Sequence, residues 1–425
     1  MSKNVFKFLN QRGFLDQTSS EELEKLEEAS HSVYVGFDPT SDSLHLGNLV
    51  GIVALSWMEK FGHKPYALVG GATGRIGDPS GKSTERPFLD DLVLENNVKQ
   101  IGLQLKTILD RCKTSTSITI MDNHQWYKNI NVIDFLRDVG KHFRLGAMLA
   151  KESVKLRLNS QEGMSFTEFS YQMLQGYDFY HLFNNHQINV QMGGSDQWGN
   201  ITAGLELIRR LTAKTAHGAT FHLLTKSDGK KFGKTESGAV WLSAEKMIPY
   251  EFYQYLVQTA DSDVIQLLKM LTFLETDEIM KLEKEMKSTD YLPNRAQKIL
   301  AKEVTTFVHG KEACDIAVDV TNKARPGAEA SLNAQDLIAL SSNMPHKEMA
   351  LIQVLNQKYT HLAAESGIVT SRSEALRLVK NQGAYLNNEK ITDPNYVITE
   401  KDLIDQKYVL LGMGKKKKLL ISVSK

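Results

Sequence analysis

The chain has 425 residues, 41% of them hydrophobic and 24% charged, a composition typical of a soluble protein of about three domains. Its formal net charge of +1 excludes a uniformly basic surface, so any nucleic-acid binding must use a local patch. We expect a cytoplasmic protein, because there is no apolar run of ~18 residues, no targeting signal in Met1 to Phe14, and no Cys-x-x-Cys pair.

Strands and helices alternate through the first two-thirds of the chain. Short apolar runs predict strands at 33–37, 66–69, 117–121 and 188–192. Periodic apolar positions predict helices at about 44–61, 90–111, 132–142, 147–157, 166–183 and 201–211. This alternation predicts an α/β fold, a Rossmann-like, doubly wound parallel sheet. We assign it to residues 1–225, with a helical insertion at about 125–185.

The remaining third of the chain divides into four segments that differ in composition and in their predicted secondary structure. Residues 226–245 form a glycine- and lysine-rich catalytic loop region, 246–325 an all-helical domain, 326–350 a linker, and 351–425 a small α+β domain. From Ser371 to Lys425 there are 11 Lys/Arg against 6 Asp/Glu, whereas the rest of the chain has 40 against 44. Concentrated basic charge at one end predicts an RNA-binding appendage.

The first motif follows the first strand. Gly36-Phe37-Asp38-Pro39-Thr40 is followed by His45-Leu46-Gly47-Asn48, where a helix begins. A helix N-terminus offers free N–H groups to a phosphate, His45 can add a donor, and Gly47 leaves room for a base or ribose. Taken alone, His-x-Gly-Asn more often marks a capping histidine beside a packing glycine.

The second motif is Lys231-Phe232-Gly233-Lys234-Thr235, in a segment flanked by glycines. Two lysines three residues apart can neutralise charge developing on a leaving pyrophosphate. An isolated Lys-x-x-Lys is more commonly a solvated turn.

The third motif, Gly193-Gly194-Ser195-Asp196-Gln197-Trp198-Gly199-Asn200, ends the fourth strand. Ligands bind at the carboxyl ends of strands in open α/β sheets, and a carboxylate there can accept both ribose hydroxyls. A glycine turn with a capping aspartate is the simpler interpretation of Gly-Gly-x-Asp.

The fourth motif lies on the helix at 166–183, where Tyr171, Gln175 and Asp178 share one face. Buried polar groups need partners, so these three side chains indicate either a pocket for a polar ligand or exposure to water.

Gly81-Lys82-Ser83 imitates the end of a phosphate-binding loop, but position 76 is Ile76 where that motif needs glycine. We therefore interpret Lys82 and Arg86 as a cationic continuation of the strand-end loop at 73–78.

Near the C-terminus, a short helix is expected to expose Arg372, Arg377 and Lys380, and a lysine run follows at Lys415 to Lys418. This segment resembles the small RNA-binding fold of a ribosomal small-subunit protein, which suits phosphate contacts to structured RNA.

In this order, the motifs resemble those of bacterial-type tyrosyl-tRNA synthetases, which are class I aminoacyl-tRNA synthetases. The resemblance implies activation of tyrosine with Mg·ATP and transfer of tyrosine to the 3′-terminal ribose of its tRNA. For tyrosine it implies contacts from Tyr34 and Asp178 to the phenol, from Asp78, Tyr171 and Gln175 to the ammonium, and from Gln197 near the carboxylate. For ATP it implies Gly36, Asp38, Thr40, His45, Gly47, Asn48, Gly194 and Asp196, with Lys231, Lys234 and Thr235 over the pyrophosphate and Lys82 and Arg86 as further cations. For RNA it implies Arg372, Arg377, Lys380, Lys415 and Lys416.

The resemblance also implies a homodimer that binds no membrane, with Mg²⁺ arriving on ATP and no metal held by the protein itself. Asn48 departs from the family pattern, which has a second histidine there, and Val35 stands where a cysteine often occurs. Three other functions stay open: tryptophan activation, a non-catalytic RNA-binding relative, and a small-molecule nucleotidyltransferase. Tyr34 with Asp178 favours a phenol, the two loop lysines favour catalysis, and the basic C-terminal unit favours an RNA substrate.

Overall fold

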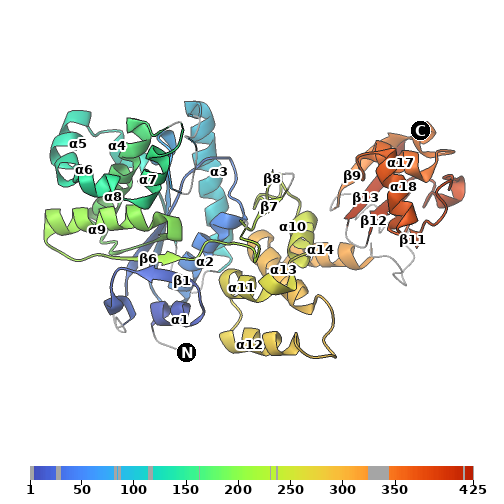
Figure 1. The fold of residues 1–425 in the computed structure, drawn as a ribbon, viewed down its shortest axis with the longest axis horizontal. Coiled ribbons are helices and arrows are strands. Elements are labelled where there is room, and N and C mark those ends of the chain that lie inside the picture. Colours follow the sequence, from blue (N-terminus) through green and yellow to red (C-terminus); the bar gives the residue numbers. More distant parts are fainter. Residues whose placement is uncertain are drawn as a thin grey trace. The chain divides into compact units, whose positions relative to one another are not determined.

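The computed structural model describes residues 4–24, 30–80, 84, 88–112, 118–161, 163–229, 231–235, 238–323, 344–414 and 417–424 (Figure 1). Two compact units divide the chain, Met1–Ser243 with Ala260–Ala296, and Ala244–Thr259 with Gln297–Lys425. The finer division expected from the sequence, with boundaries at 225, 245, 325 and 350, stays a prediction.

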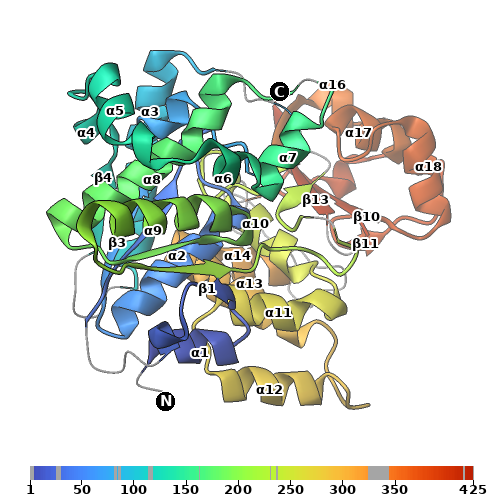
Figure 2. The same ribbon diagram turned by 60° about the vertical axis from the view of Figure 1, so that its left-hand side comes forward.

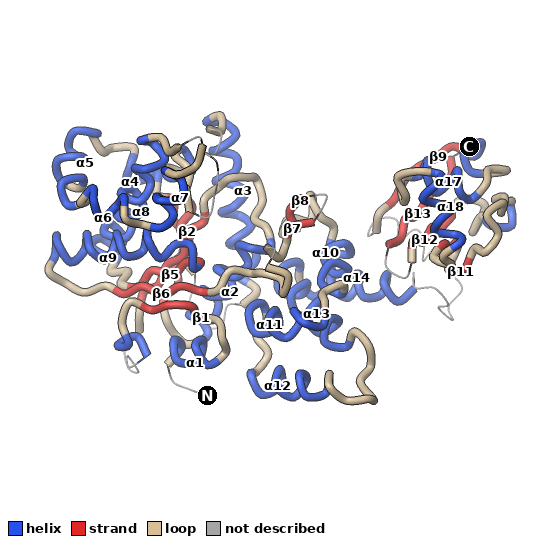
Figure 3. The backbone as a smooth tube through the Cα atoms, in the orientation of Figure 1, coloured by secondary structure: helices blue, strands red, loops and turns tan. Residues whose placement is uncertain are grey.

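A six-stranded sheet forms the centre of the first unit (Figure 3). Its order is β1 (Leu15–Thr18), β6 (His217–Phe221), β5 (Val190–Gly194), β2 (Ser32–Phe37), β3 (Lys64–Val69) and β4 (Thr119–Asp122). All neighbours are parallel except β1, which runs antiparallel to β6. The predicted doubly wound parallel sheet is thus confirmed, whereas β1 and β6 were missed.

Helices cover both faces of this sheet (Figures 1 and 2). One pair is α2 (Leu46–Lys60) with α3 (Asp91–Asp110), and the other is α8 (Phe166–His186) with α9 (Trp198–Thr212). Gly204 lets α9 approach α8 closely, because a Cβ there would lie 2.9 Å from the Phe179 ring. Burial of Phe179, Leu182 and Ile188 against the sheet contributes about 1.5–3 kcal/mol per side chain.

The helical insertion lies between β4 and α8 and consists of short helices. They are α4 (His124–Tyr127), α5 (Val132–Asp138), α6 (Leu145–Leu149) and α7 (Glu152–Leu158). A buried ion pair ties α7 to α8: Arg157 Nη2 lies 2.7 Å from Glu168 Oε2. Several apolar side chains of the insertion are largely exposed, namely Val132, Ile133, Leu136, Leu145 and Leu156.

Three further helices pack onto the first unit. They are α1 (Val5–Gln11), α11 (Asp261–Leu271) and α12 (Thr276–Glu285). α11 packs on α2, and thereby joins a segment late in the chain to the helix layer of the six-stranded sheet.

The second unit contains helices and a second sheet. The helices are α10 (Pro249–Val257), most of α13 (Arg295–His309), α14 (Lys311–Lys323), α16 (Leu351–Val354), α17 (Tyr359–Ser366) and α18 (Arg372–Lys380). The sheet order is β11 (Glu389–Lys390), β10 (Ala384–Leu386), β12 (Tyr408–Met413), β13 (Lys417–Ser424) and β9 (His346–Ala350). Residues 326–343 of the predicted linker lie outside the described residues, and 346–350 belong to β9. None of the helices that the structure describes is long and apolar enough to span a membrane.

Candidate active site

A cavity of about 320 Å³ opens at the carboxyl ends of β2 and β5. The two strands are parallel neighbours, and the chain continues from β2 to one side of the sheet and from β5 to the other. Open α/β sheets bind ligands at this switch point. The cavity lining includes residues from every one of the first four motifs, among them Tyr34, Gly36, Asp38, Thr40, His45, Gly47, Asn48, Asp78, Tyr171, Gln175, Asp178, Gly194, Asp196, Gln197, Lys231 and Lys234.

Tyr34 and Asp178 form the buried part of the cavity, which is the candidate site for a phenol. Tyr34 is 1% exposed, and its hydroxyl has no hydrogen-bond partner among the described residues. Asp178 is 2% exposed, and burial raises the pKa of its carboxyl to about 7, although hydrogen bonds from Asn123 and Trp126 oppose this shift. A buried hydroxyl without a partner costs free energy until a polar ligand pairs with it.

Two side chains that the sequence interpretation missed hold the Asp178 carboxylate. Asn123 Nδ2 donates to Oδ2 at 3.0 Å, and Trp126 Nε1 donates to Oδ1 at 2.9 Å. Both follow directly after β4, at the same edge of the sheet as the cavity. Their position after a predicted strand was the signal by which they could have been found.

A hydrogen-bonded chain connects these residues to the first motif. Asn123 Nδ2 also donates to Thr73 Oγ1 at 3.0 Å, and Thr73 donates to Asp38 Oδ1 at 2.8 Å. The Tyr171 hydroxyl donates to Asp38 Oδ2, also at 2.8 Å. Asp38 therefore orients Tyr171 and Thr73 at the cavity wall.

Unpaired amide oxygens also line the cavity. Gln175 Oε1 and Gln191 Oε1 are buried and have no hydrogen-bond partner among the described residues. Gln191 was missed in the sequence, and it lies beside Tyr34 in the register of β2 and β5. Oxygens of this kind can only accept, so they suit a ligand with N–H donors such as an ammonium.

Asp78, which follows β3, is hydrogen-bonded to Gln197, which follows β5. Its Oδ2 accepts from Gln197 Nε2 at 2.7 Å, and its Oδ1 accepts from the Ser80 backbone N–H at 3.0 Å. Asp78 and Gln197, predicted at the ammonium and the carboxylate of the amino-acid substrate, are therefore direct neighbours.

His45 and Asn48 cap the start of α2 reciprocally. His45 Nδ1 accepts from the Gly47 N–H at 3.1 Å, and Asn48 Oδ1 accepts from the His45 N–H at 3.0 Å. Because Nδ1 is an acceptor, a neutral imidazole carries its proton on Nε2 and can donate it. Asn48, the departure from the family pattern, completes the cap, and Gly47 leaves the His45 ring in place, since a Cβ would lie 3.0 Å from that ring.

Gly194 and Asp196 shape the opposite wall. A Cβ at Gly194 would lie 2.7 Å from Asp196 Oδ1 and 2.8 Å from Leu223, so a larger residue there would displace the Asp196 carboxylate. Burial and the nearby Asp78 raise the pKa of Asp196, and Lys231 opposes this shift.

The lysine motif packs against the start of α2. Gly233 has φ +87°, and a Cβ there would lie 3.1 Å from Leu46 Cβ. Lys231 and Lys234 are exposed and line the cavity. The hairpin continues through β7 (Lys234–Thr235) and β8 (Gly238–Ala239), and the Thr235 side chain, like Lys82 and Arg86, lies outside the described residues.

The basic C-terminal residues are only partly as expected. Arg372, Arg377 and Lys380 are exposed on α18, whereas Lys415 and Lys416 lie outside the described residues. The interpretation of the whole lysine run as an exposed cluster is wrong for Lys418, which is 4% exposed with its ammonium 5.4 Å from the Tyr385 ring centroid. Because side chains alternate along β13, Lys417 points outward and Lys418 inward, and burial lowers the pKa of Lys418 to about 8.

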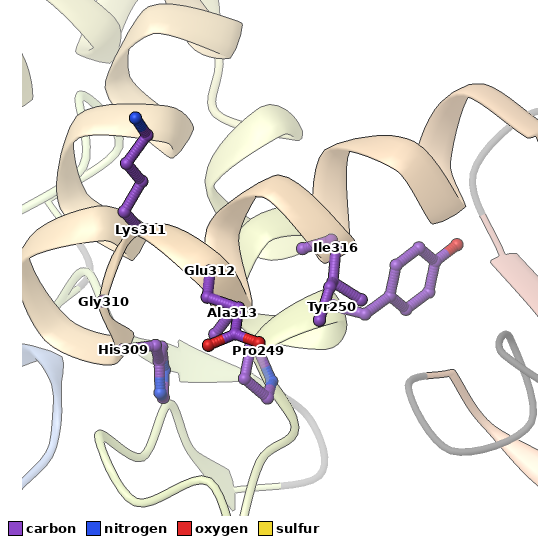
Figure 4. A pocket seen from close by; sticks show the side chains of 9 residues that line it. Pro249, Tyr250, His309, Gly310, Lys311, Glu312, Ala313 and Ile316 are labelled. Carbon is purple, nitrogen blue, oxygen red and sulfur yellow. The ribbon is translucent and has the colours of Figure 1, made fainter.

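A second cavity, of about 420 Å³, lies in the second unit beside the turn between α13 and α14. Figure 4 shows Tyr250 pointing away from His309 and Glu312, so the polar groups around this cavity do not converge. None of the predicted site residues lines it. Within the described part of the chain, no group of three or more His, Cys, Asp or Glu could hold a metal ion.

Comparison with known protein families gives two matches that together span most of the chain. Residues 26–324 match the family described as tRNA synthetases class I (W and Y). Residues 336–421 match the tyrosine–tRNA ligase SYY-like C-terminal domain.

Individual relatives agree with these matches. The chain is 55% identical over 418 residues to the tyrosine–tRNA ligase of Protochlamydia amoebophila, covering 98% of both chains. It is 47% identical to the chloroplastic/mitochondrial tyrosine–tRNA ligase of Arabidopsis thaliana, covering 99% of this chain and 84% of that one. A C-terminally truncated mitochondrial tyrosyl-tRNA synthetase of Aspergillus nidulans superposes with a TM-score of 0.67 at 31% identity, covering 74% of this chain and 92% of that chain.

Proposed function

Since the chain belongs to the class I tyrosyl-tRNA synthetases and is a tyrosine–tRNA ligase, we propose that the cavity between β2 and β5 holds tyrosine and ATP during adenylate formation. The observation that carries this assignment is that two buried groups line the same part of the cavity, the Tyr34 hydroxyl, which has no partner among the described residues, and the Asp178 carboxylate. A phenol placed between them supplies one donor and one acceptor, which satisfies both groups.

The amino-acid end of tyrosine fits the polar groups nearer the strand ends. Asp78, Tyr171 and Gln175 hold the ammonium, since a carboxylate, a phenolic oxygen and the unpaired Gln175 Oε1 can each accept from it. Gln197 lies near the tyrosine carboxylate through its hydrogen bond to Asp78.

ATP fits the opposite end of the cavity. The N-terminus of α2 and the His45 Nε2–H face the phosphates, with Thr40 beside them. Gly36 and Gly47 leave room for the nucleoside, and Gly194 does the same on the other wall. Asp38 lines this end of the cavity as well, and the Asp196 carboxylate accepts the ribose hydroxyls. Mg²⁺ enters as the counterion of ATP.

The chemistry needs positioning and charge stabilisation. The tyrosine carboxylate attacks the α-phosphorus in line, the bond to the bridging oxygen breaks, and tyrosyl-adenylate and pyrophosphate result. Lys231, Lys234 and Thr235 close over the pyrophosphate, with Lys82 and Arg86 as further cations. A ribose hydroxyl of the tRNA then attacks the adenylate carbonyl and releases AMP.

We assign tRNA contacts, assembly and location on separate observations. Arg372, Arg377 and Lys380 are exposed cations of the C-terminal domain, which the chain shares with tyrosine–tRNA ligases, and Lys415 and Lys416 extend the set. The exposed apolar side chains of the insertion support a homodimer, because exposed apolar surface favours association. The free thiols Cys112 and Cys314 are compatible with a reducing cytoplasm.

The test is ATP–pyrophosphate exchange with each of the twenty amino acids. We expect exchange to depend on tyrosine, and to be lost in a Tyr34→Phe, Asp178→Ala double variant at tyrosine concentrations that saturate the unaltered enzyme. Exchange that tryptophan supports equally well, or that the double variant retains in full, contradicts the assignment of this cavity.

A further inference from the structure

A helix remote from the cavity holds the base of the lysine loop. The Ser227 backbone N–H donates to Asp263 Oδ1 at 3.0 Å. Ser262 Oγ donates to the same oxygen at 3.0 Å, and it lies 3.0 Å from Ser227 Oγ. Since Ser262 uses its one hydroxyl proton on Asp263, Ser227 is the donor of the bond between the two serines. Two hydrogen bonds thus connect Ser227 to the first turn of α11, and a third joins its two partners there.

Ser227 belongs to the turn that positions Lys231. The Gly229 N–H donates to the Lys226 carbonyl at 2.9 Å, which closes a four-residue turn with Ser227 as its second residue. Beyond the turn, Lys231 pairs with Thr225 in an antiparallel bridge, and the Phe232 N–H donates to the Leu224 carbonyl at 2.9 Å. Fixing Ser227 therefore fixes the strand pair that carries Lys231 to the cavity.

Asp263, which anchors the lysine loop, lies on a helix that is held at both ends. Asp263 is 8% exposed and lies in the first turn of α11, where the positive end of the helix dipole favours its negative charge. At the other end of α11, the buried Arg12 guanidinium donates to the carbonyls of Lys269 and Leu274 at 2.7 and 2.6 Å. It also donates to the Thr272 carbonyl at 2.8 Å. Both ends of α11 are thus tied to the unit that contains the cavity.

We propose that Asp263 is a positioning residue for adenylate formation, which places Lys231 and Lys234 through its hydrogen bond to Ser227. The proposal rests on the pyrophosphate role proposed above for those lysines. It predicts an effect on the step in which pyrophosphate leaves and none on tyrosine binding, because the cavity wall around Tyr34 and Asp178 receives no hydrogen bond from this anchor among the described residues.

The experiment compares Asp263→Ala, Asp263→Asn and, as a control on an exposed position of the same helix, Gln266→Ala. Rapid mixing gives the rate of adenylate formation, equilibrium titration gives tyrosine affinity, and thermal melting reports folding. We expect Asp263→Ala to slow the chemical step by roughly tenfold, less than the roughly 10²-fold that a misplacement of about 1 Å can cost, with tyrosine affinity unchanged. Asp263→Asn keeps an acceptor oxygen for the Ser227 N–H and should stay within about threefold of the unaltered enzyme.

A double-mutant cycle with Lys231→Ala distinguishes a failure of the Asp263 proposal from a failure of the pyrophosphate role proposed for the loop lysines. If Asp263 acts through the loop, the double variant should be slowed by less than the product of the two single effects, because only Lys234 is then left for Asp263 to position. An unchanged rate in Asp263→Ala, weakened tyrosine binding, or effects that multiply would each overturn the positioning role. If Lys231→Ala itself has no effect, the pyrophosphate role fails first. Should Asp263→Ala not fold, Ser262→Ala removes the two hydrogen bonds that the exposed Ser262 hydroxyl makes with Asp263 and Ser227 and keeps the bond from the Ser227 N–H to Asp263. This variant should slow the same step by about twofold, and an unaltered rate there overturns the proposal.

Discussion

The indole nitrogen of Trp126 donates a hydrogen bond of 2.9 Å to Asp178 Oδ1, inside the wall of the proposed tyrosine site. Asn123 holds the other carboxylate oxygen at 3.0 Å. Burial favours the protonated form of this carboxyl and the two donors favour the ionised form, so that its pKa stands at about 7. Burial and the two donors therefore oppose one another at the carboxyl that faces the proposed phenol site.

Asp178→Asn should lower the selectivity for tyrosine over phenylalanine. The amide keeps the volume but changes the hydrogen-bonding pattern that the phenol needs, at a cost of about 1–3 kcal/mol, or roughly tenfold in selectivity. The measurement is kcat/KM for both amino acids. Trp126→Phe, which removes one donor and keeps the carboxylate, should shift the ratio in the same direction by less. Selectivity that survives Asp178→Asn would remove this residue from the specificity site.

Lys231→Ala and Lys234→Ala should each slow adenylate formation by roughly 10²-fold or more, the scale for losing a charge-stabilising donor. Tyrosine affinity should barely change, since both lysines are exposed on the loop at the ATP end of the cavity. Rapid mixing and an equilibrium tyrosine titration measure the two quantities separately. Lys226→Ala, in the same segment but outside the cavity lining, is the control and should retain the rate. Weaker tyrosine binding at an unaltered chemical rate would mean that the loop contacts the amino acid.

Acid should destabilise the fold through a buried histidine pair at the amino edge of the sheet. His63 Nδ1 accepts from the His31 backbone N–H at 3.1 Å, and burial, with the nearby His31 ring, lowers the pKa of His63 to about 4 from 6.5. The unfolded chain binds this proton below about pH 6.5, whereas the folded chain resists it until about pH 4. Stability is therefore present above about pH 6.5 and is lost as the pH falls, by about 2 kcal/mol at about pH 5.

Urea unfolding at about pH 7 and about pH 5 checks this expectation. His63→Gln, which has no titrating ring, should lose less stability between the two pH values than the unaltered protein. An exposed histidine, His222→Gln, should leave the difference unchanged. Equal acid sensitivity of the His63 variant and the unaltered protein would assign the loss to other groups.

The sequence predicted the sheet and most of the cavity lining because these depend on local signals. Strand ends followed by glycines, and the face shared by Tyr171, Gln175 and Asp178, can be read without knowing the tertiary fold. Asn123 and Trp126 follow a predicted strand, but their hydrogen bonds to Asp178 depend on β4 lying beside β3, and the sequence does not specify that neighbour. β1 was missed because it is a four-residue edge strand, and Lys418 was misjudged because strand alternation in β13 decides which lysine of a run is buried.

The exposed apolar residues of the insertion should hold a homodimer together. Ile133 is 66% and Leu136 45% exposed, three residues apart on one face of α5. Replacing both by aspartate should yield monomers in light scattering at concentrations where the unaltered protein is dimeric, because charge at an apolar interface is desolvated on association. Leu292→Asp is the control, since Leu292 is 71% exposed outside the insertion. A dimer that survives the double substitution would place the interface elsewhere.

Deleting the C-terminal domain should separate the two half-reactions. The cavity residues all lie between Tyr34 and Ala239, so a chain ending before β9 should retain tyrosine-dependent pyrophosphate exchange. It should also keep its mass as a dimer if the insertion forms the interface. The truncated chain loses the exposed cations of α18, and phosphate contacts from such cations release counterions, so tRNA charging should fall steeply.

In the full-length protein, the salt dependence of tRNA affinity tests the RNA-binding role of α18 more directly. Affinity for tRNA should fall as salt rises, and replacing Arg372, Arg377 and Lys380 by glutamine should reduce the slope of log affinity against log salt by about one for each RNA phosphate that is no longer neutralised. Lys401→Gln, an exposed lysine of the same domain outside this set, should leave the slope unchanged. If truncation abolishes exchange together with charging, the C-terminal domain supports the catalytic fold. In that case, or if the triple variant keeps the full salt slope, the separate RNA-binding role of α18 has to be withdrawn.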